Sequence, residues 1–233
     1  MFSVFIKLTV VIMMYKMTAV NCNFDHGRKS CYQVMMTKRI QQRTKETHAR
    51  LIATAQQLIG EGGYDALRIE EVVTRAGVAK GTFFAHFSDK DTLMDQLIGE
   101  RIHQLLDEME AVAIPDGLDE FVERLLPRMQ FMTSERYVFD VILRRSGAAG
   151  IEQVGPIALA FDRYIDIIIR WLEAGYFRQD VPMAILAEGV QAFETQAMAM
   201  NFCAVHSQLS LHERILPYLR AWLLVPACEN APG

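Results

Sequence analysis

The sequence predicts an all-α protein with a short N-terminal helical domain and a longer helical C-terminal bundle. Apolar residues recur at helical spacing from Thr44 to Leu224, and the C-terminal part shows no strand-like alternation. Charge divides the chain as well. Residues 1–90 hold 13 Lys and Arg against 7 Asp and Glu, whereas residues 91–233 hold 11 and 21. A basic front and an acidic back favour a front that meets a polyanion, with chance variation of surface charge as the alternative.

Composition narrows the class of protein further. Apolar residues make up 51% of the chain and charged residues 22%, which is typical of a globular protein, and the net charge of −4 is not that of a whole-chain nucleic-acid binder. None of the four cysteines lies in a C-x-x-C pair or beside a histidine at ligand spacing; they are Cys22, Cys31, Cys203 and Cys228. We therefore expect no metal site and no disulfide framework, and reduced thiols in the cytoplasm.

The first 35 residues are apolar but interrupted. The uncharged run between Lys7 and Lys16 is eight residues, too short to span a bilayer. Residues 1–35 are interpreted first as an extension from an upstream start, because "MTKRIQQRTKETHARLI" from Met36 looks like a natural beginning. A disordered tail and an export signal are the second and third interpretations. Residues 36–43 then form a basic arm ahead of the first helix.

A first helix is expected from Thr44. Its apolar stripe consists of Leu51, Ile52, Ala55, Leu58 and Ile59. The helix is expected to end at "EGGYD", where Gly63 can take the left-handed conformation and Tyr64 can fold back on the stripe.

Two shorter helices follow and form a motif over about residues 68–87. Ile69 to Ala76 places its apolar residues on one face, Gly77 provides a sharp turn, and a third helix runs from about Ala79 to His86. Two helices joined by a short glycine turn are typical of a helix-turn-helix.

The third helix has two unlike faces. At roughly 100° per residue, Phe83 and Phe87 lie side by side on a core stripe. The opposite face has small residues in its centre and larger groups at its edges: Gly81, Thr82 and Ala85, then Lys80, Phe84 and His86. A small centre lets a helix approach a groove, and Lys80 and His86 can reach phosphates. An ordinary three-helix corner is the alternative, and it leaves the small face unexplained.

At this point a family resemblance can be stated. "TKETHARLIATAQQLIGEGGYDALRIEEVVTRAGVAKGTFFAHFSDKDTLMDQLI" resembles the DNA-binding domain of the tetracycline-repressor (TetR) family of bacterial regulators, through "GGYDA", "AGV-x-KGT" and "HF-x-x-K-x-x-L". The resemblance covers about residues 44–102. It implies a three-helix, homeodomain-like helix-turn-helix domain there, and a C-terminal effector-binding and dimerisation domain over residues 103–233.

The resemblance also implies DNA-contacting positions. They are Arg68, Ala79, Lys80, Gly81, Thr82, Phe84, Ala85, His86 and Lys90. Three of these depart from the family pattern, because Arg68 and Ala79 stand where Ser or Thr is common and Phe84 replaces the usual tyrosine. Four cations of the arm can add salt-dependent phosphate contacts or can simply solubilise a tail; they are Lys38, Arg39, Arg43 and Lys45.

The C-terminal part resembles the family only in size, helical pattern and "AGYFRQDVP". Asp180 with Pro182 predicts a helix start, and Pro217 is expected to kink or delay the last helix. We find no catalytic motif and no clustered Asp and His, so the chain is not expected to be an enzyme and no cofactor is expected.

For the C-terminal part the family implies an effector pocket and a dimer made by the last two helices. Six residues are candidates for the pocket or for ordinary core: Phe131, Met132, Trp171, Phe193, Met198 and Met200. "AEGVQAFETQAMAM" is rich in small residues and suits a dimer seam, with Trp222, Leu219 and Leu223 as a second wall. Expected partners are double-stranded DNA, a second copy of the chain and a small-molecule effector, without a membrane. The alternatives are a DNA-bound accessory protein without an effector, and an exported or membrane-tethered protein.

Overall fold

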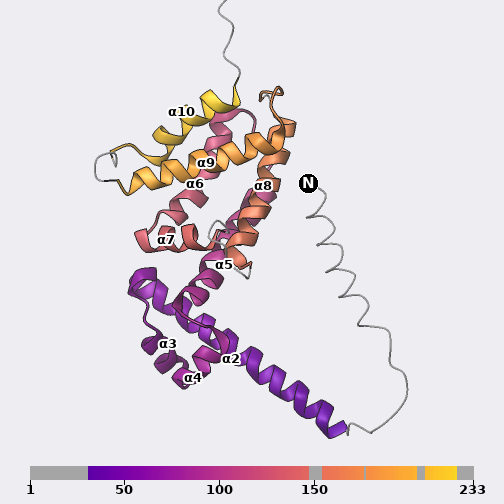
Figure 1. Cartoon of the computed structure of the whole chain (residues 1–233), viewed down its shortest axis with the longest axis vertical. Helices are drawn as coiled ribbons and strands as arrows, with labels where there is room; N and C mark the ends of the chain where they lie inside the picture. Colours follow the sequence, from indigo (N-terminus) through magenta and orange to yellow (C-terminus); the bar gives the residue numbers. More distant parts are fainter. Residues whose placement is uncertain (1–30, 147–153, 176, 204–207, 225–233) are drawn as a thin grey trace, which may run out of the picture. The chain divides into compact units, whose positions relative to one another are not determined.

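The computed structural model describes residues 31–146, 154–175, 177–203 and 208–224; the side chains of residues 31–38 and 40 are not described. Within these residues the chain is helical throughout, with no strand, which confirms the all-α prediction (Figure 1). The helices are α2 (Cys31–Ala66), α3 (Ile69–Ala76), α4 (Lys80–His86), α5 (Lys90–Ala111), α6 (Leu118–Met132), α7 (Arg136–Arg145), α8 (Pro156–Ala174), α9 (Met183–Asn201) and α10 (Leu211–Leu223). The predictions made for residues 1–30 lie outside the described residues.

The chain divides into two compact units, Met1–Glu46 and Thr47–Gly233. The described part of the first unit is helical from Cys31, although the sequence predicted a helix start at Thr44. The physical reason is that residues 31–46 contain neither Gly nor Pro and are rich in Gln, Lys and Arg, which favour helix. The predicted boundary between residues 102 and 103 lies within α5, and the division into two domains at this point stays a prediction.

The basic arm therefore lies on helix α2. Arg39, Arg43 and Lys45 are all exposed, whereas the side chain of Lys38 lies outside the described side chains. Gln42 donates a hydrogen bond of 2.9 Å to Glu46 one turn later. The arm keeps its cations in solvent, but in a helical rather than an extended backbone.

In the second unit, the three helices of the N-terminal domain enclose a small core. The α2 side chains Leu51, Ala55 and Leu58 are buried there, as the stripe predicted. Gly77 adopts φ 62° and ψ 41° at the end of α3, which is the left-handed conformation that the turn requires. Helix α2 is broken at Gly63, where φ is positive as expected but ψ is 175°, so the residue is not left-handed helical.

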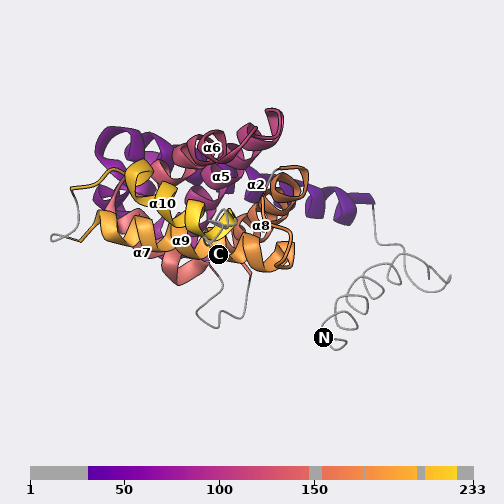
Figure 2. The ribbon, with the colours of Figure 1, turned by 90° about the horizontal axis from the view of Figure 1, so that it is seen from above.

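The C-terminal bundle is built around α5 and α8, which pack extensively on each other. Helix α9 packs between α8 and α10, and α10 also covers α6; α9 and α10 lie side by side in both views (Figures 1 and 2). These four contacts give the bundle a continuous apolar core that is shared by all of its helices.

One proline prediction for the bundle is confirmed and one needs correction. Helix α9 begins at Met183 with Pro182 as its N-cap, as predicted, while Asp180 forms an ion pair with Arg178 at 2.6 Å. Pro217 does not delay α10, which starts at Leu211 behind a capping box made by Ser210 and Glu213. Good N-capping and burial of Ile215 and Leu219 on either side of the proline outweigh its local cost.

Over the described ranges, no helix has the length and apolarity needed to cross a membrane. In the same part of the chain, no group of three or more His, Cys, Asp or Glu side chains is placed to hold a metal ion.

Candidate nucleic-acid interface

Helix α4, which the sequence predicted to contact DNA, packs against the core through its aromatic side chains. Phe83 is 0% exposed and Phe87 is also buried, and their ring centroids lie 5.5 Å apart. Ala79 is the N-cap of the helix and provides no side-chain cap bond, as its methyl group predicted. With one side fixed in the core, the helix presents its other side to solvent.

The exposed side of α4 is small in its centre. Gly81 and Ala85 are exposed and Thr82 is half-buried. No Cβ contact would arise within 4 Å if Gly81 carried a side chain, so its smallness leaves open space in front of the helix. This is the shape that a helix needs to enter the major groove closely.

Lys80 and Glu70 form an ion pair at the edge of this surface. Their Nζ and Oε1 atoms are 2.6 Å apart, and the side chains are 56% and 68% exposed. The hydrogen bond from Lys80 lowers the pKa of Glu70. Because exposed pairs contribute little to stability, Lys80 can leave Glu70 for a phosphate at small cost.

Phe84 lies between packing and exposure. Its ring meets Phe83 edge-on, with centroids 5.4 Å apart, yet the residue is 44% exposed. One edge of the ring therefore rests on the core while a large part of its apolar surface faces solvent, where it can contact a sugar or a thymine methyl group.

The cations Arg68 and Lys90 are engaged inside the chain. Arg68 Nη1 donates to the carbonyl of Asp65 at 2.6 Å and to that of Leu67 at 3.1 Å. Lys90 Nζ lies 4.4 Å from the ring centroid of Tyr137 and 3.4 Å from the Asp65 carbonyl. Burial, and then the nearby Arg68 charge, lower the pKa of Lys90. Both residues fasten the turn before α3 in this structure; Arg68 is nevertheless exposed, whereas Lys90 is half-buried.

His86 is placed differently from what the helical wheel suggested. Its ring centroid lies 5.6 Å from that of His48, and the residue is half-buried. Burial, followed by the charge of His48, lowers the pKa of His86 below its ordinary value of 6.5. At neutral pH His86 is uncharged, so it can offer a hydrogen bond to DNA but not a full positive charge.

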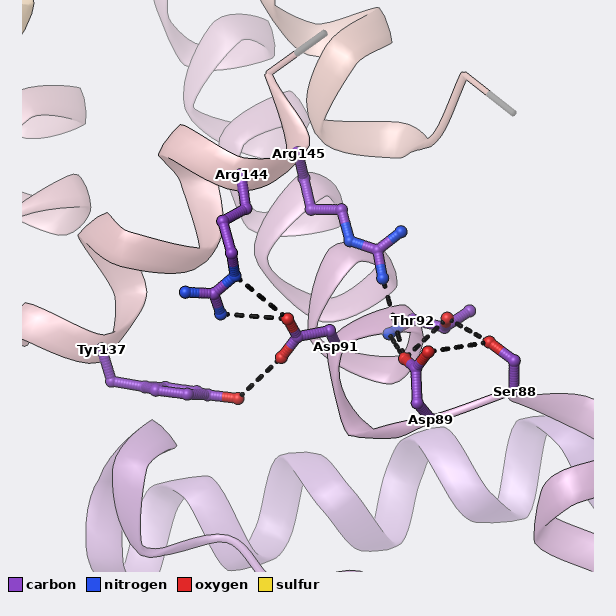
Figure 3. Close-up of polar contacts among 7 residues, drawn as sticks. All are labelled: Ser88, Asp89, Asp91, Thr92, Tyr137, Arg144 and Arg145. Atoms are coloured by element: carbon purple, nitrogen blue, oxygen red, sulfur yellow. Dashed lines mark hydrogen bonds and ion pairs between the residues drawn. The ribbon is translucent and has the colours of Figure 1, made fainter. Parts of the chain in front are cut away.

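A group of contacts between α7 and the N-terminal domain was not visible in the sequence; we call its residues Glu135, Tyr137, Arg144 and Arg145 the α7 clamp. Figure 3 shows its charged part, in which Arg144 Nε and Nη2 donate to Asp91 Oδ2 at 3.2 and 3.0 Å. The Tyr137 hydroxyl donates to the other oxygen of Asp91 at 3.4 Å. The clamp thus holds the first turn of α5, directly after the recognition helix.

Asp89 extends this network while it caps α5. Its Oδ1 accepts from the backbone N–H of Thr92 at 2.7 Å and lies 3.7 Å from Arg145 Nη2 (Figure 3). Burial works to raise the pKa of Asp89, but the hydrogen bonds from Thr92 and Ser88 and the Arg145 charge lower it overall. The ionised carboxylate is also favoured by its place at a helix N-terminus.

Glu135 holds the break in α2. Its two carboxylate oxygens accept hydrogen bonds from the backbone N–H groups of Tyr64 at 2.8 Å and Asp65 at 2.9 Å. A Cβ atom on Gly63 would lie 2.7 Å from Glu135 Oε1, and the positive φ of this residue independently favours glycine. These partners are separated by about 70 residues, and no sequence pattern indicates such a pair.

The six predicted pocket residues are distributed through the bundle. Met132, Trp171 and Met198 are buried, and Met200 is half-buried. Phe131 meets the ring of Tyr64 edge-on at 6.0 Å, and Phe193 stacks on Tyr218 at 5.4 Å. A common pocket formed by these side chains stays a prediction.

The predicted second wall of a dimer seam is wrong for two of its three residues. Leu219 and Leu223 are fully buried within the chain, because α10 turns them toward α6 and α9. Trp222 is half-buried, and its Nε1 donates to the Leu186 carbonyl at 3.0 Å. Its ring lies against Gly189 of α9.

The bundle contains a cavity of about 360 Å³ between α5 and α6. Its lining consists of Leu105, Glu108, Met109, Val112, Glu120, Glu123, Arg124, Pro127 and Arg128. Arg128 is almost fully buried, and its Nη2 pairs with Glu194 Oε2 at 2.6 Å. The Tyr164 hydroxyl donates to the same oxygen at 2.6 Å, and the guanidinium lies over the Tyr164 ring at 3.7 Å. Helical periodicity treats Arg128 and Glu194 as surface residues, so the sequence did not indicate this cluster.

Fold and site together define a helix-turn-helix DNA-binding domain joined to an all-helical C-terminal bundle. Comparisons with known proteins agree with that class. Residues 51–97 match the family model of bacterial regulatory proteins of the tetR family. The chain is 28% identical over 106 residues to the HTH-type transcriptional regulator YvdT of Bacillus subtilis. The matched segment covers 46% of this chain and 55% of YvdT, so the chain spans about half the length of that relative.

Longer matches cover both domains. An HTH-type transcriptional regulator of Haemophilus influenzae is 24% identical over 190 residues, covering 77% of this chain and 89% of that protein. Among solved structures, the TetR-family repressor FadR of Thermus thermophilus, in complex with lauroyl-CoA, has a TM-score of 0.56 at 18% identity over 80% of this chain and 99% of that one. Residues 51–97 are therefore similar to the DNA-binding domain of tetR-family regulators, and over more of its length the chain is similar to HTH-type transcriptional regulators.

Proposed function

We propose that this regulator is a repressor that binds a palindromic operator as a dimer and leaves it when a small molecule binds the C-terminal bundle. The observation that carries the DNA-binding half is the exposed face of α4. Gly81, Thr82 and Ala85 form a flat centre, and Lys80 stands at its edge in an exposed pair that is easily exchanged. This combination fits close entry into a major groove, with Lys80 on the backbone.

Dimerisation is supported by the outer surfaces of the last two helices. Ala184, Ile185 and Ala192 on α9 and Ala221 on α10 lie at least partly in solvent, and three of the four are small enough to let two helices approach closely. A two-fold dimer would place two copies of α4 about one turn of DNA apart, roughly 34–36 Å in helix-turn-helix dimers. Light scattering on the purified protein tests this; a monomer at micromolar concentration contradicts it.

Release of DNA by an effector needs a structural connection between the C-terminal bundle and the helix-turn-helix domain. The α7 clamp offers such a connection. It joins α7 to the first turn of α5 through Asp91 and to the turn at Gly63 through Glu135. A ligand that shifts α7 would move the elements on both sides of α4. DNA and ligand would then disfavour each other by one coupling free energy. Such a regulator acts in the cytoplasm, where its DNA is.

The test is a gel shift with DNA from upstream of the protein's own gene, at physiological salt and with excess competitor DNA. We expect a sequence-selective shift. K80A should bind more weakly to every sequence, whereas T82A should mainly change which sequences are preferred. Absence of a selective shift contradicts the proposal.

The second candidate is a DNA-bound accessory protein without an effector. It is favoured by the burial of Met132, Trp171 and Met198, which is also what an ordinary packed core produces. A thermal-shift screen with small molecules separates the two candidates, because only the effector-responsive protein gains stability from a ligand.

A further inference from the structure

The cavity between α5 and α6 ends at a buried cation whose hydrogen bonds are incomplete. Arg128 is 2% exposed and lines the cavity. Its Nη2 binds Glu194, and its Nη1 donates to the Met132 sulfur at 3.1 Å, which is a weak acceptor. Its Nε has no acceptor among the described residues. A buried N–H without an acceptor is unfavourable, so an oxygen atom supplied by a ligand would be stabilised there.

The charge around the cavity restricts the ligand. The positive charge of Arg128 is matched by Glu194, whose Oε2 accepts from both Arg128 and Tyr164. The outer wall carries the carboxylates Glu108, Glu120 and Glu123 against the single guanidinium of Arg124. Glu120 pairs with Arg124, and Glu108 lies 3.4 Å from Arg101 outside the lining. Both guanidinium groups of the lining are thus already paired with carboxylates, so an anion finds no unpaired cation there, and a cationic head group offers no acceptor to Arg128 Nε.

The shape and the remaining lining indicate the body of the ligand. The cavity of about 360 Å³ is near the lower end of the ~300–1,000 Å³ range of small-molecule sites. Its apolar lining residues are Leu105, Met109, Val112 and Pro127, and none of the nine lining residues is aromatic. An aliphatic body is therefore a better match than a stacked ring system.

We propose that the cavity binds a small, uncharged aliphatic molecule whose hydroxyl or carbonyl oxygen accepts a hydrogen bond from Arg128 Nε, and that it rejects carboxylates and CoA esters. The proposal deepens the proposed effector function and rests on it for its biological meaning. It separates this chain from the structurally similar FadR of Thermus thermophilus, which holds lauroyl-CoA.

The first experiment uses four probes with the same eight-carbon body: 1-octanol, octanoate, octylamine and octanoyl-CoA. Binding to the full chain without DNA is followed by thermal shift and calorimetry. We expect 1-octanol to raise Tm by roughly 5 °C at about a hundredfold excess over its Kd, and the two anions to give no shift. Stronger binding of octanoate, octylamine or octanoyl-CoA, or no shift with any probe, as for a cavity that holds only solvent, overturns the proposal.

The second experiment uses variants that keep the bundle folded. R128M/E194Q removes the donor without leaving a buried charge, and the amide oxygen of the introduced glutamine can still accept from Tyr164. We expect 1-octanol to bind about tenfold or more weakly to it. R220Q is the control, because Arg220 is an exposed guanidinium on α10 that does not line the cavity, so its loss should leave the affinity for 1-octanol unchanged. Equal binding to R128M/E194Q and the original protein contradicts the role of Arg128.

The third measurement separates this proposal from the repressor function. If 1-octanol binds in an Arg128-dependent way but does not release DNA in a gel shift, the site stands and effector release fails. If octanoyl-CoA releases DNA and 1-octanol does not, effector release stands and the ligand class proposed here is wrong.

Discussion

The N-terminal domain and the C-terminal bundle hold their opposite charges in contrasting ways. In the helix-turn-helix, Lys80 and Glu70 pair at 2.6 Å with more than half of each side chain in solvent. In the bundle, Arg128 and Glu194 pair at the same distance with 2% and 0% exposed. A cation and a carboxylate at the same separation therefore contribute differently to stability in the two places.

Solvent decides the difference. Water screens the surface pair, so it contributes about 0–1 kcal/mol and its partners can be exchanged for a phosphate. The buried pair makes the protein little more stable than two apolar side chains in its place would. Removal of only one of its members, however, leaves an uncompensated buried charge. A surface that contacts DNA needs an exposed, exchangeable pair, and an internal group that holds a ligand needs a buried, fixed pair.

The largest expected effect breaks the buried pair. R128M leaves the fully buried Glu194 without its cation, so this group must either keep an unpaired charge or take up a proton, and the free energy of unfolding should fall by about 3–5 kcal/mol. Urea denaturation measures it. R128M/E194Q should recover most of the loss, because the uncompensated charge is gone. If single and double variants are equally unstable, the loss comes from packing and not from charge.

A smaller loss is expected from the α7 clamp. E135A removes the acceptor of the Tyr64 and Asp65 N–H groups, which should lower the free energy of unfolding by about 1–2 kcal/mol, since the carboxylate is partly solvated. The neighbouring R136A breaks the exposed Arg136–Asp140 pair and should change stability by less than about 0.5 kcal/mol. Equal effects of the two variants would show that Glu135 is only a surface residue.

The surface pair is tested through DNA rather than through stability. K80A should reduce the slope of log K against log salt by about 0.9, because one phosphate contact is lost. E70Q should bind DNA as tightly as the original protein or more tightly, since Lys80 loses a competing partner. Weaker DNA binding by E70Q would mean that Glu70 positions Lys80 instead of competing for it. F84Y completes the series and should tighten binding if position 84 reaches the DNA backbone.

The last expected effect is a dependence on pH, which appears only in alkaline solution. Burial, followed by the Asp91 charge, raises the pKa of Tyr137 from 10.0 to about 12. Between these values the folded state keeps a proton that the unfolded state has lost, so the free energy of unfolding falls as pH rises through this range. Y137F should lack this part of the dependence. The measurement is the difference between the two proteins' denaturation midpoints across that range, and parallel curves would contradict the assignment.

The spacing of residues along the sequence predicted the helix-turn-helix domain well. Phe83, Phe87 and Gly77 follow from the 3.6-residue period and from the turn that a glycine permits, which depend on neighbours a few residues away. The small face of α4 follows from the same wheel. The positions of Arg68 and Lys90 were predicted, but their attachment to Asp65 and Tyr137 was not.

Contacts between distant segments were beyond that reasoning. Glu135 meets Tyr64, and Arg128 meets Glu194, only after the bundle has formed, and their residue types alone favour the surface. Leu219 looked available for a partner because a helical stripe does not say which neighbour it faces. The start of α2 at Cys31 was missed for a simpler reason. The residues before Thr44 show little of the apolar periodicity used to find helices, although their individual helix propensities are good.

One carbon atom fixes how closely α10 approaches α9. Gly189 faces the Trp222 ring at a distance where any Cβ would collide with the indole. An alanine at position 189 would have to lift α10 or turn the indole away from the Leu186 carbonyl. If α9 and α10 together face a second copy of the chain, the absence of a methyl group at position 189 determines the shape of the shared surface. That shape would in turn determine the distance between the two copies of α4 on the DNA.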